Sequence, residues 1–176
     1  MKSLIRPAVT LFALLTAFTG VLYPLAVTGV AKLAFPDQAS GSILMKDGQA
    51  IGSSLIGQNF SDPKYFWGRP SATSPMAYNG ANSGGSNLGP TNPALIDAIK
   101  GRIAALKAAD PSNDAPIPVD LVTASASGLD PEISVAAIDY QVARVAKARG
   151  VSNDVIAALV SRHRIERLSG CWPNPA

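Results

Sequence analysis

Cysteine and histidine are nearly absent from this sequence of 176 residues. The single cysteine, Cys171, excludes an internal disulfide and a zinc site made of several cysteines. The single histidine, His163, excludes the common metal sites that combine several imidazoles. We therefore expect no metal site in this chain, and we interpret Cys171, beside Trp172, as a structural or incidental thiol.

Charged residues are also scarce. They make up 15% of the chain, against about 25% in an average soluble domain, while 47% of the residues are hydrophobic. The net charge of +3 comes from Lys2, Arg6 and Lys32, because the residues after Lys32 hold equal numbers of acidic and basic side chains. No basic face remains to neutralise phosphates, which excludes nucleic acid as a partner.

Charge is wholly absent from residues 7–31. As a helix rising about 1.5 Å per residue, this run is about 37 Å long, which exceeds the roughly 30 Å hydrocarbon core of a bilayer. We predict a single transmembrane helix over 7–31, with Pro7 in its first turn and a kink at Pro24. A cleaved signal peptide is the alternative, but its apolar region has only about 7–15 residues and an A-x-A site follows it, which this sequence lacks.

The charges that flank this run indicate its orientation. Lys2 and Arg6 precede it, and Lys32 follows it. By the positive-inside rule, residues 1–6 are expected in the cytoplasm and residues 36–176 outside it, as a periplasmic domain. Small residues on adjoining helix faces would let another helix approach closely, although they also fit ordinary spanning composition: Ala13, Thr16, Ala17 and Gly20.

Short apolar runs separated by turn residues follow the predicted helix. Residues 42–45 and 54–56 are expected to be strands, and Lys46-Asp47-Gly48-Gln49 between them has the Asp-Gly signal of a hairpin turn. The aromatic cluster at residues 65–67 is predicted to lie in the core rather than to bind a ligand.

Residues 70–96 form a second stretch without charge, and they are rich in Gly, Asn, Ser and Pro. This composition does not suit a regular helix, and a loop of this length is usually functional or disordered. Disordered segments are normally highly charged, so we expect an ordered loop. Residues 83–86, Ser-Gly-Gly-Ser, could hold an anion with backbone N–H groups, but they lack the lysine and the spacing of a phosphate-binding loop.

Three amphipathic helices are predicted after this loop. The first is expected to start at Asn92-Pro93 and stop at Asp110. The second is expected to start at Asp130-Pro131 and stop at Gly150, and the third to start at Ser152 and stop at Ser169-Gly170. Their expected buried stripes are Leu95, Ile96, Ile99, Ile103 and Leu106; Val135, Ile138, Val142 and Val145; and Ile156, Leu159 and Val160.

A short strand is predicted at residues 121–123, between the first two helices. The small residues 124–128 that follow would allow another backbone to approach closely. Helices mixed with short strands indicate an α/β (or α+β) extracytoplasmic domain, tethered by the single N-terminal transmembrane helix.

Catalysis by this chain alone lacks support in its motifs. A serine hydrolase would need His163 as the base, with one of four candidate nucleophiles: Ser83, Ser86, Ser125 and Ser127. The sequence has no G-x-S-x-G or H-x-x-E-H motif. We interpret His163 as a surface side chain and keep the hydrolase as the weakest alternative.

Several motifs resemble one protein family. They are Arg6-Pro7, Gly20 and Tyr23-Pro24-Leu25, Gly52-Ser53 with residues 55–58, and the longer segments 65–72, 83–93 and 120–134. Together they resemble the C subunit of the bacterial Kdp potassium-transporting P-type ATPase. The resemblance covers nearly the whole chain, apart from residues 171–176.

This resemblance implies an inner-membrane complex that imports K⁺ at the expense of ATP. In that family a channel-like A subunit carries the K⁺ path, the B subunit is the phosphorylated pump, and a small F subunit accompanies them. The C subunit has one span and no catalytic chemistry, and it is described as a catalytic chaperone that raises the pump's affinity for ATP. The resemblance thus implies that the complex uses ATP and K⁺, with no cofactor held by this chain.

An external domain cannot contact cytoplasmic ATP, so its effect on ATP affinity would be indirect. We hypothesise that the uncharged loop and residues 120–134 dock on the outer face of the channel-like subunit. Within these segments the candidates for subunit contact are Ser83, Gly84, Gly85, Ser86, Asn87, Leu88, Thr123, Ser125, Ser127 and Asp130. The alternative is a membrane-anchored envelope protein whose loop recognises glycan or peptide.

Overall fold

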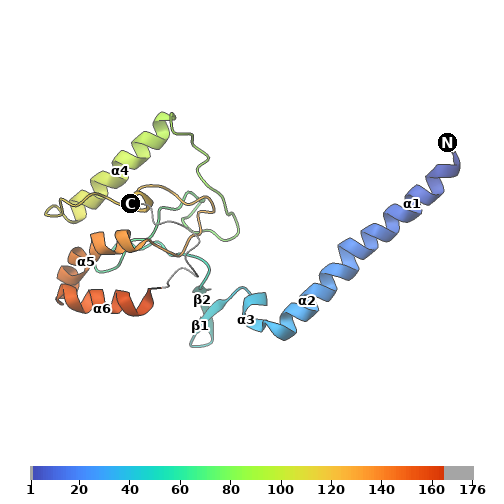
Figure 1. Cartoon of the computed structure of the whole chain (residues 1–176), viewed down its shortest axis with the longest axis horizontal. Helices are drawn as coiled ribbons and strands as arrows, with labels where there is room; N and C mark the ends of the chain where they lie inside the picture. The colour runs from blue at the N-terminus through green and yellow to red at the C-terminus, as the bar shows by residue number, and fades with distance from the viewer. Residues whose placement is uncertain (1, 165–176) are drawn as a thin grey trace, which may run out of the picture. The chain divides into compact units, whose positions relative to one another are not determined.

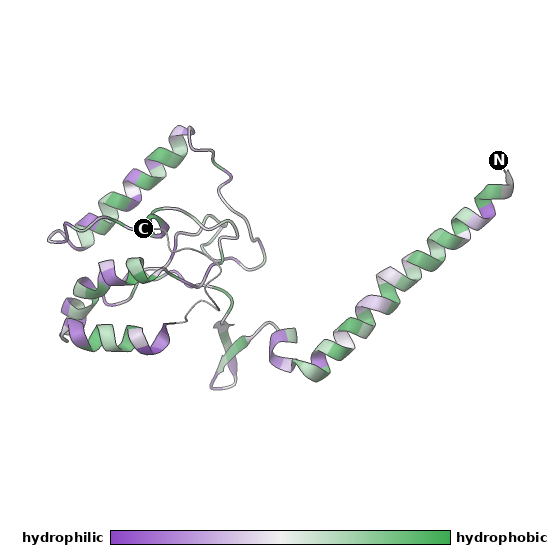
Figure 2. Cartoon of the chain, in the orientation of Figure 1, coloured by the Kyte–Doolittle hydropathy of each residue, from purple (hydrophilic) through white to green (hydrophobic). Residues whose placement is uncertain are grey.

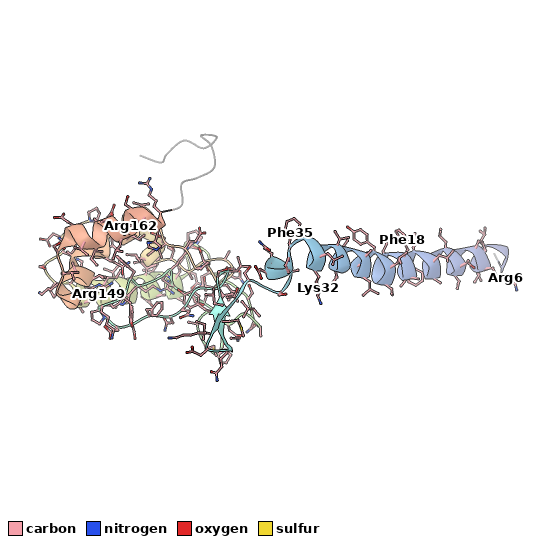
Figure 3. The ribbon with its side chains drawn as sticks, turned by 90° about the horizontal axis from the view of Figure 1, so that it is seen from below. Arg6, Phe18, Lys32, Phe35, Arg149 and Arg162 are labelled. Carbon is pink, nitrogen blue, oxygen red and sulfur yellow. The ribbon has the colours of Figure 1, made fainter. Side chains whose placement is uncertain are left out.

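A long apolar helix begins the chain (Figures 1 and 2). In the computed structural model, which describes residues 2–164, α1 spans Lys2–Ala17, the π-helical turn η1 spans Phe18–Leu22, and α2 spans Tyr23–Ala34. Residues Leu4–Ala34 form a continuous helix that is long and apolar enough to cross a membrane, and its large apolar side chains are exposed. The predicted transmembrane helix is therefore present, with Arg6 near one end and Lys32 near the other (Figure 3).

The two prolines of this helix differ from expectation. Because α1 begins at Lys2, Pro7 lies inside the helix rather than in its first turn. The distortion expected at Pro24 takes the form of η1, in which the Tyr23 N–H donates to the carbonyl of Phe18, five residues earlier. A proline ring clashes with the carbonyl four residues before it in a regular α-helix, and the wider π turn relieves that clash.

A short helix and a hairpin complete the first of two compact units, which ends at Leu55. α3 spans Pro36–Ala39, and the antiparallel strands β1 and β2 span Ile43–Lys46 and Gln49–Ser53. Asp47 and Gly48 both have positive φ, 52° and 77°, as a type I′ turn requires, which confirms the predicted turn. The strand expected at residues 54–56 is wrong, because a two-residue turn pairs Lys46 with Gln49 and thereby places the second strand at 49–53.

The second unit starts at Ile56 and is helical in its regular structure. Its elements are α4 (Pro93–Ala109), the 3₁₀ turn η2 (Val119–Leu121), α5 (Val135–Arg149) and α6 (Asn153–His163). One buried cluster joins α4, η2 and the first half of α5, and another joins the second half of α5 to α6. With the hairpin, these helices make an α+β structure tethered by a single N-terminal helix.

Most predicted helix ends are confirmed. The Asn92 side chain accepts a hydrogen bond from the Ala94 N–H at 3.0 Å at the start of α4. Gly150 adopts the left-handed conformation that ends α5, and Ser152 occupies the N-cap position of α6. The stop expected at Ser169-Gly170 is wrong, because α6 ends at His163 and Arg164 already has an extended backbone.

The buried stripes of α4 and α6 are confirmed in part. Leu106 and Ile156 are buried, and Ile99, Ile103 and Val160 pack against the two clusters. Ile96 and Leu159 are exposed instead, at 43% and 46%. Both lie at the edge of their stripe.

The predicted start of α5 at Asp130-Pro131 is wrong. Ser134 is the N-cap: its hydroxyl accepts from the Ala137 N–H at 3.0 Å and donates to the Asp120 carboxylate at 3.1 Å. The Asp130 carboxylate is instead paired with Arg69. The predicted stripe is confirmed in part: Val145 is buried and Val142 packs against its cluster, whereas Val135 is 39% exposed. The buried face also carries Ala137, Tyr140, Gln141 and Arg144.

Residues 121–123 do not form the predicted strand. The Thr123 N–H and hydroxyl both donate to the Val119 carbonyl, at 2.9 and 2.8 Å, so these donors are used within a local turn. Leu121 and Val122 are nevertheless buried, as an apolar run suggests. In the aromatic cluster, Phe66 and Trp67 pack against the core as predicted, and Tyr65 is 38% exposed.

Candidate functional site

The loop between Pro70 and Asn92 is ordered by its own hydroxyl and amide side chains. The Ser71 hydroxyl accepts from the Tyr78 N–H at 2.9 Å, and the Thr73 hydroxyl accepts from the Asn79 N–H at 3.1 Å. The Asn82 amide donates to the Ser74 carbonyl at 2.9 Å. These bonds take the place of the backbone hydrogen bonds of a helix or sheet. The prediction of an ordered, backbone-rich loop is confirmed.

The uncharged loop meets residues 124–128, the small residues within the motif 120–134. The Gly84 N–H and the Ser83 hydroxyl both donate to the Ser127 carbonyl, at 2.9 and 3.0 Å. A Cβ atom placed on Gly85 would lie 2.9 Å from the Ala126 carbonyl oxygen. The close backbone approach expected at residues 124–128 is therefore present, and its partner is the segment 83–85.

Gly128 fixes this junction from the other side. Its φ is +69°, and a Cβ atom there would lie 2.5 Å from the Thr73 methyl carbon and 2.8 Å from the Gly84 carbonyl oxygen. The Ser71 hydroxyl donates to the Gly128 carbonyl at 2.6 Å. A side chain at position 128 would thus be both strained and obstructed, so the junction requires glycine.

An ion pair connects the motif 120–134 to Arg69, which follows the aromatic cluster at residues 65–67. Arg69 Nη1 lies 3.2 Å from the Asp130 carboxylate, and Arg69 Nε donates to the Thr123 carbonyl at 3.4 Å. The Tyr78 hydroxyl donates to the Arg69 carbonyl at 2.6 Å. Burial, and then the negative charge of Asp130, raise the pKa of Tyr78 above its ordinary value. The Arg69–Asp130 pair is neutral as a whole, so this surface remains close to uncharged.

Some of the candidate contact residues lie together at the junction, and others are buried or bonded within the chain. Ser83, Gly84, Gly85 and Ser127 meet at the junction, next to the exposed Ser86 and Asn87 and the half-buried Leu88. Ser125 is buried, and its hydroxyl accepts from the Gly128 N–H at 2.9 Å. Thr123 and Asp130 bond within the chain, as described above. The helix candidates Ala13, Thr16, Ala17 and Gly20 are all exposed on α1 and η1.

The described residues form neither a metal site nor a serine–histidine pair. Among the described residues, no three His, Cys, Asp or Glu side chains lie close enough to hold a metal. His163 Nδ1 is 2.9 Å from the Leu159 carbonyl oxygen, and in the described part of the chain it has no hydrogen bond to any of the four serines proposed as nucleophiles. The hydrolase arrangement, in which a serine bonds the imidazole, is thus not formed in this structure.

Sequence reasoning missed the polar side chains of α5 that hold the aromatic segment. Gln141 bonds both backbone groups of Trp67, and the Arg144 guanidinium donates to the carbonyls of Pro63 and Tyr65. Arg144 also lies over the Trp67 ring, 4.4 Å from its centroid. The one available signal was a glutamine and an arginine three positions apart on a helix whose expected stripe was apolar.

Comparison with known proteins gives a consistent result. The family model described as "K+-transporting ATPase, c chain" (KdpC) matches residues 5–176, including residues 171–176 that the motifs did not cover. A protein of Dechloromonas aromatica (strain RCB) named potassium-transporting ATPase KdpC subunit is 66% identical over 175 residues, which are 99% of this chain and 92% of that protein. Proteins of the same name from Polaromonas naphthalenivorans (strain CJ2) and Variovorax paradoxus (strain S110) are 65% and 63% identical, over 92% and 99% of this chain and 83% and 91% of their own length.

Proposed function

This chain belongs to the KdpC family, the c chain of the K⁺-transporting ATPase, and from that membership we propose that it acts as a non-catalytic accessory subunit that docks on the outer face of the channel-like subunit. Potassium transport and the transmembrane helix follow from the family and from residues 4–34. The position of the domain, its contacts and its effect on ATP affinity are parts of the proposal.

The proposed orientation places residues 1–6 in the cytoplasm and residues 36–176 in the periplasm, with the helix in the inner membrane. The basic residues Lys2 and Arg6 on one side and Lys32 on the other support it. An external domain has no access to cytoplasmic nucleotide. The effect on the pump subunit therefore has to pass through protein contacts.

The observation that carries the docking proposal is the junction between Gly84 and Ser127. It joins residues 83–85 and 124–128, which carry no charge and lie far apart in the sequence, into one surface of backbone groups and small side chains. Such a surface allows close approach of another subunit. Because it bears no net charge, it would neither repel K⁺ near a channel entrance nor retain it.

Two further contacts complete the proposed assembly. The small residues Ala13, Thr16, Ala17 and Gly20 are exposed on the membrane helix, which supports contact with another spanning helix of the complex. The proposed partners are the channel-like A subunit, the ATP-hydrolysing B subunit, the small F subunit and the lipid bilayer. The complex uses ATP and K⁺, and this chain itself is proposed to hold no cofactor.

Within this assembly the chain would act as a catalytic chaperone by indirect means. Docking that favours one arrangement of the channel-like and pump subunits shifts the pump's ATP affinity by the difference in contact energy between its states. A tenfold change in ATP affinity needs a difference of only about 1.4 kcal/mol. The envelope-protein alternative is not favoured, because the similarity to KdpC subunits covers almost the whole chain.

A matched pair of surface variants tests the docking surface. Ser86 and Ser161 are both exposed, the first beside the junction and the second on α6. We expect Ser86→Arg to weaken co-purification with the channel-like subunit and to lower the pump's ATP affinity, and Ser161→Arg to change neither. Equal assembly of both variants, or full assembly and ATP affinity with a chain that lacks residues 36–176, would refute the docking proposal.

A further inference from the structure

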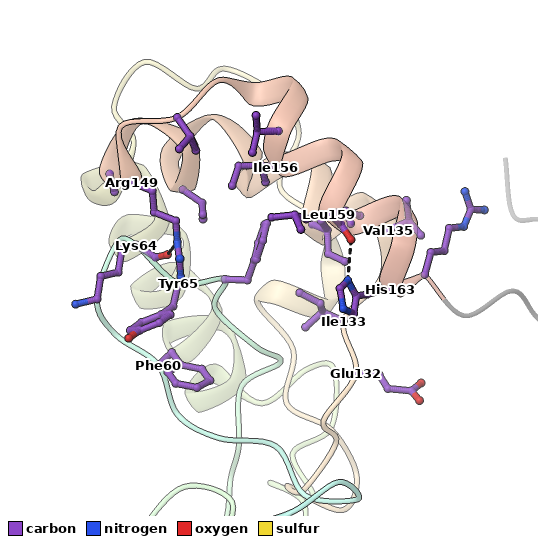
Figure 4. A pocket seen from close by; sticks show the side chains of 18 residues that line it. Phe60, Lys64, Tyr65, Glu132, Ile133, Val135, Arg149, Ile156, Leu159 and His163 are labelled. Carbon is purple, nitrogen blue, oxygen red and sulfur yellow. Dashed lines mark hydrogen bonds between the residues drawn. The ribbon is translucent and has the colours of Figure 1, made fainter.

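An apolar groove lies between α5, α6 and the segment 60–66 (Figure 4). Its volume is about 980 Å³, within the range of natural binding pockets. Apolar side chains form most of its lining, among them Phe60, Tyr65, Val135, Val155 and Leu159. No residue of this lining belongs to the junction of residues 83–85 with residues 124–128.

The groove has the character of a core that lacks one covering layer. Val145 and Ile156, which line it, are only 1% and 5% exposed and belong to a buried cluster. Val155 and Leu159 on its wall are 49% and 46% exposed. A continuous apolar patch of this kind marks a surface that another segment covers.

The path of the chain indicates which segment that is. Arg164, the last described residue, lines the groove beside His163. Residues 165–176 follow Arg164 directly in the sequence, and a chain of this length can span at most about 40 Å at about 3.3 Å per residue. A segment tethered at the site has a much higher effective concentration there than a separate molecule.

The composition of residues 165–176 suits the groove. Ile165, Leu168 and Trp172 are large apolar residues spaced three and four positions apart, and the only two charged side chains, Glu166 and Arg167, have opposite signs. We propose that residues 165–176 of the same chain occupy this groove, with Leu168 and Trp172 in contact with its apolar walls.

Photo-crosslinking of the full-length chain in detergent tests this proposal. The photoreactive residue p-benzoylphenylalanine is placed at position 60, on the groove, or at position 96, on α4 outside it. We expect crosslinks from position 60, and none from position 96, to peptides within residues 165–176, as identified by mass spectrometry. Crosslinks from position 60 only to other segments, or to a second molecule, would overturn the proposal.

The single thiol provides an independent measurement. If residues 165–176 occupy the groove, a charged side chain within it should displace them and expose Cys171. We expect Leu159→Arg to raise the rate of Cys171 alkylation by a maleimide several-fold, and Ile96→Arg to leave it unchanged; both positions are partly exposed, so both variants should fold. An unchanged rate in Leu159→Arg, or protection of Cys171 only when other subunits are bound, would overturn it.

Discussion

The side-chain amide of Gln141 pairs with both backbone groups of Trp67. Its Oε1 accepts from the Trp67 N–H at 2.8 Å, and its Nε2 donates to the Trp67 carbonyl at 3.1 Å. Gln141 is only 1% exposed, and the neighbouring Arg144 donates to the Pro63 and Tyr65 carbonyls. Polar side chains of α5 thus hold residues 63–67 in the way that an adjacent strand would.

Replacement of Gln141 by leucine should destabilise the domain. The variant leaves the Trp67 N–H and carbonyl without partners, at a cost of about 1–3 kcal/mol for each buried group. Chemical unfolding of the full-length chain in detergent, followed by circular dichroism, measures the loss. Gln58→Leu is the control because Gln58 is exposed, and an equal loss in both variants would contradict the role given to Gln141.

Alanine substitutions at two glycines should have opposite effects. Gly128→Ala combines a positive φ with contacts of 2.5 and 2.8 Å, so we expect a loss of about 2 kcal/mol or more in the free energy of unfolding. Gly101 lies within α4, and a Cβ atom there meets nothing within 4 Å. Gly101→Ala should therefore stabilise the chain by about 0.5–1 kcal/mol. A stable Gly128→Ala variant would show that the junction tolerates a side chain.

The stability of the domain should fall above pH 10. Burial, and then the negative charge of Asp130, raise the pKa of Tyr78 above its ordinary value of 10.0. Burial, and then the negative charge of Asp110, raise the pKa of Tyr140 in the same way. The folded state then retains protons that the unfolded state loses, so this contribution is fully present below pH 10 and is lost as the pH rises through the folded-state pKa. Unfolding free energies measured from pH 8 to 12 should decline less steeply in Tyr78→Phe than in the unchanged chain. An equal decline would show that Tyr78 does not cause the loss of stability.

Two glycines of the membrane helix allow a matched test of helix contact. No atom lies within 4 Å of a Cβ placed at Gly20 or Gly29, so a larger side chain at either position should leave this chain's own fold intact. We expect Gly20→Leu to reduce co-purification of the other subunits, because it fills the face made by the small residues. Gly29→Leu lies about two and a half turns further on and should have little effect. Equal assembly of the two variants would show that the face formed by the small residues does not contact another subunit.

The elements that were predicted well are those that satisfy their own backbone groups locally. Asn92 caps α4 with a bond two residues away, and Asp47-Gly48 closes the hairpin between adjacent strand ends. Gly150 ends α5 through carbonyls of the preceding turn. In each case the residue type is itself the constraint, so a short window of sequence is sufficient.

The errors arose where a distant partner decided the outcome. Asp130 was expected to start α5, but its carboxylate pairs with Arg69, 61 positions away, and Ser134 became the cap. Gln141 and Arg144 occupy the buried face because they form hydrogen bonds with backbone groups of residues 63–67. The candidate site was predicted as two separate motifs for the same reason, since nothing local indicates that Gly84 meets Ser127.

The π-helical turn at Phe18–Leu22 limits how far a neighbouring helix can follow this one. A regular α-helix advances about 100° around its axis with each residue, and a π turn advances less. The small residues Ala13, Ala17 and Gly20 lie before or within the turn, so the face that they begin does not continue in line beyond Tyr23. A straight helix packed on that face therefore meets the first half of the span alone, which leaves the second half for lipid or for a different neighbour.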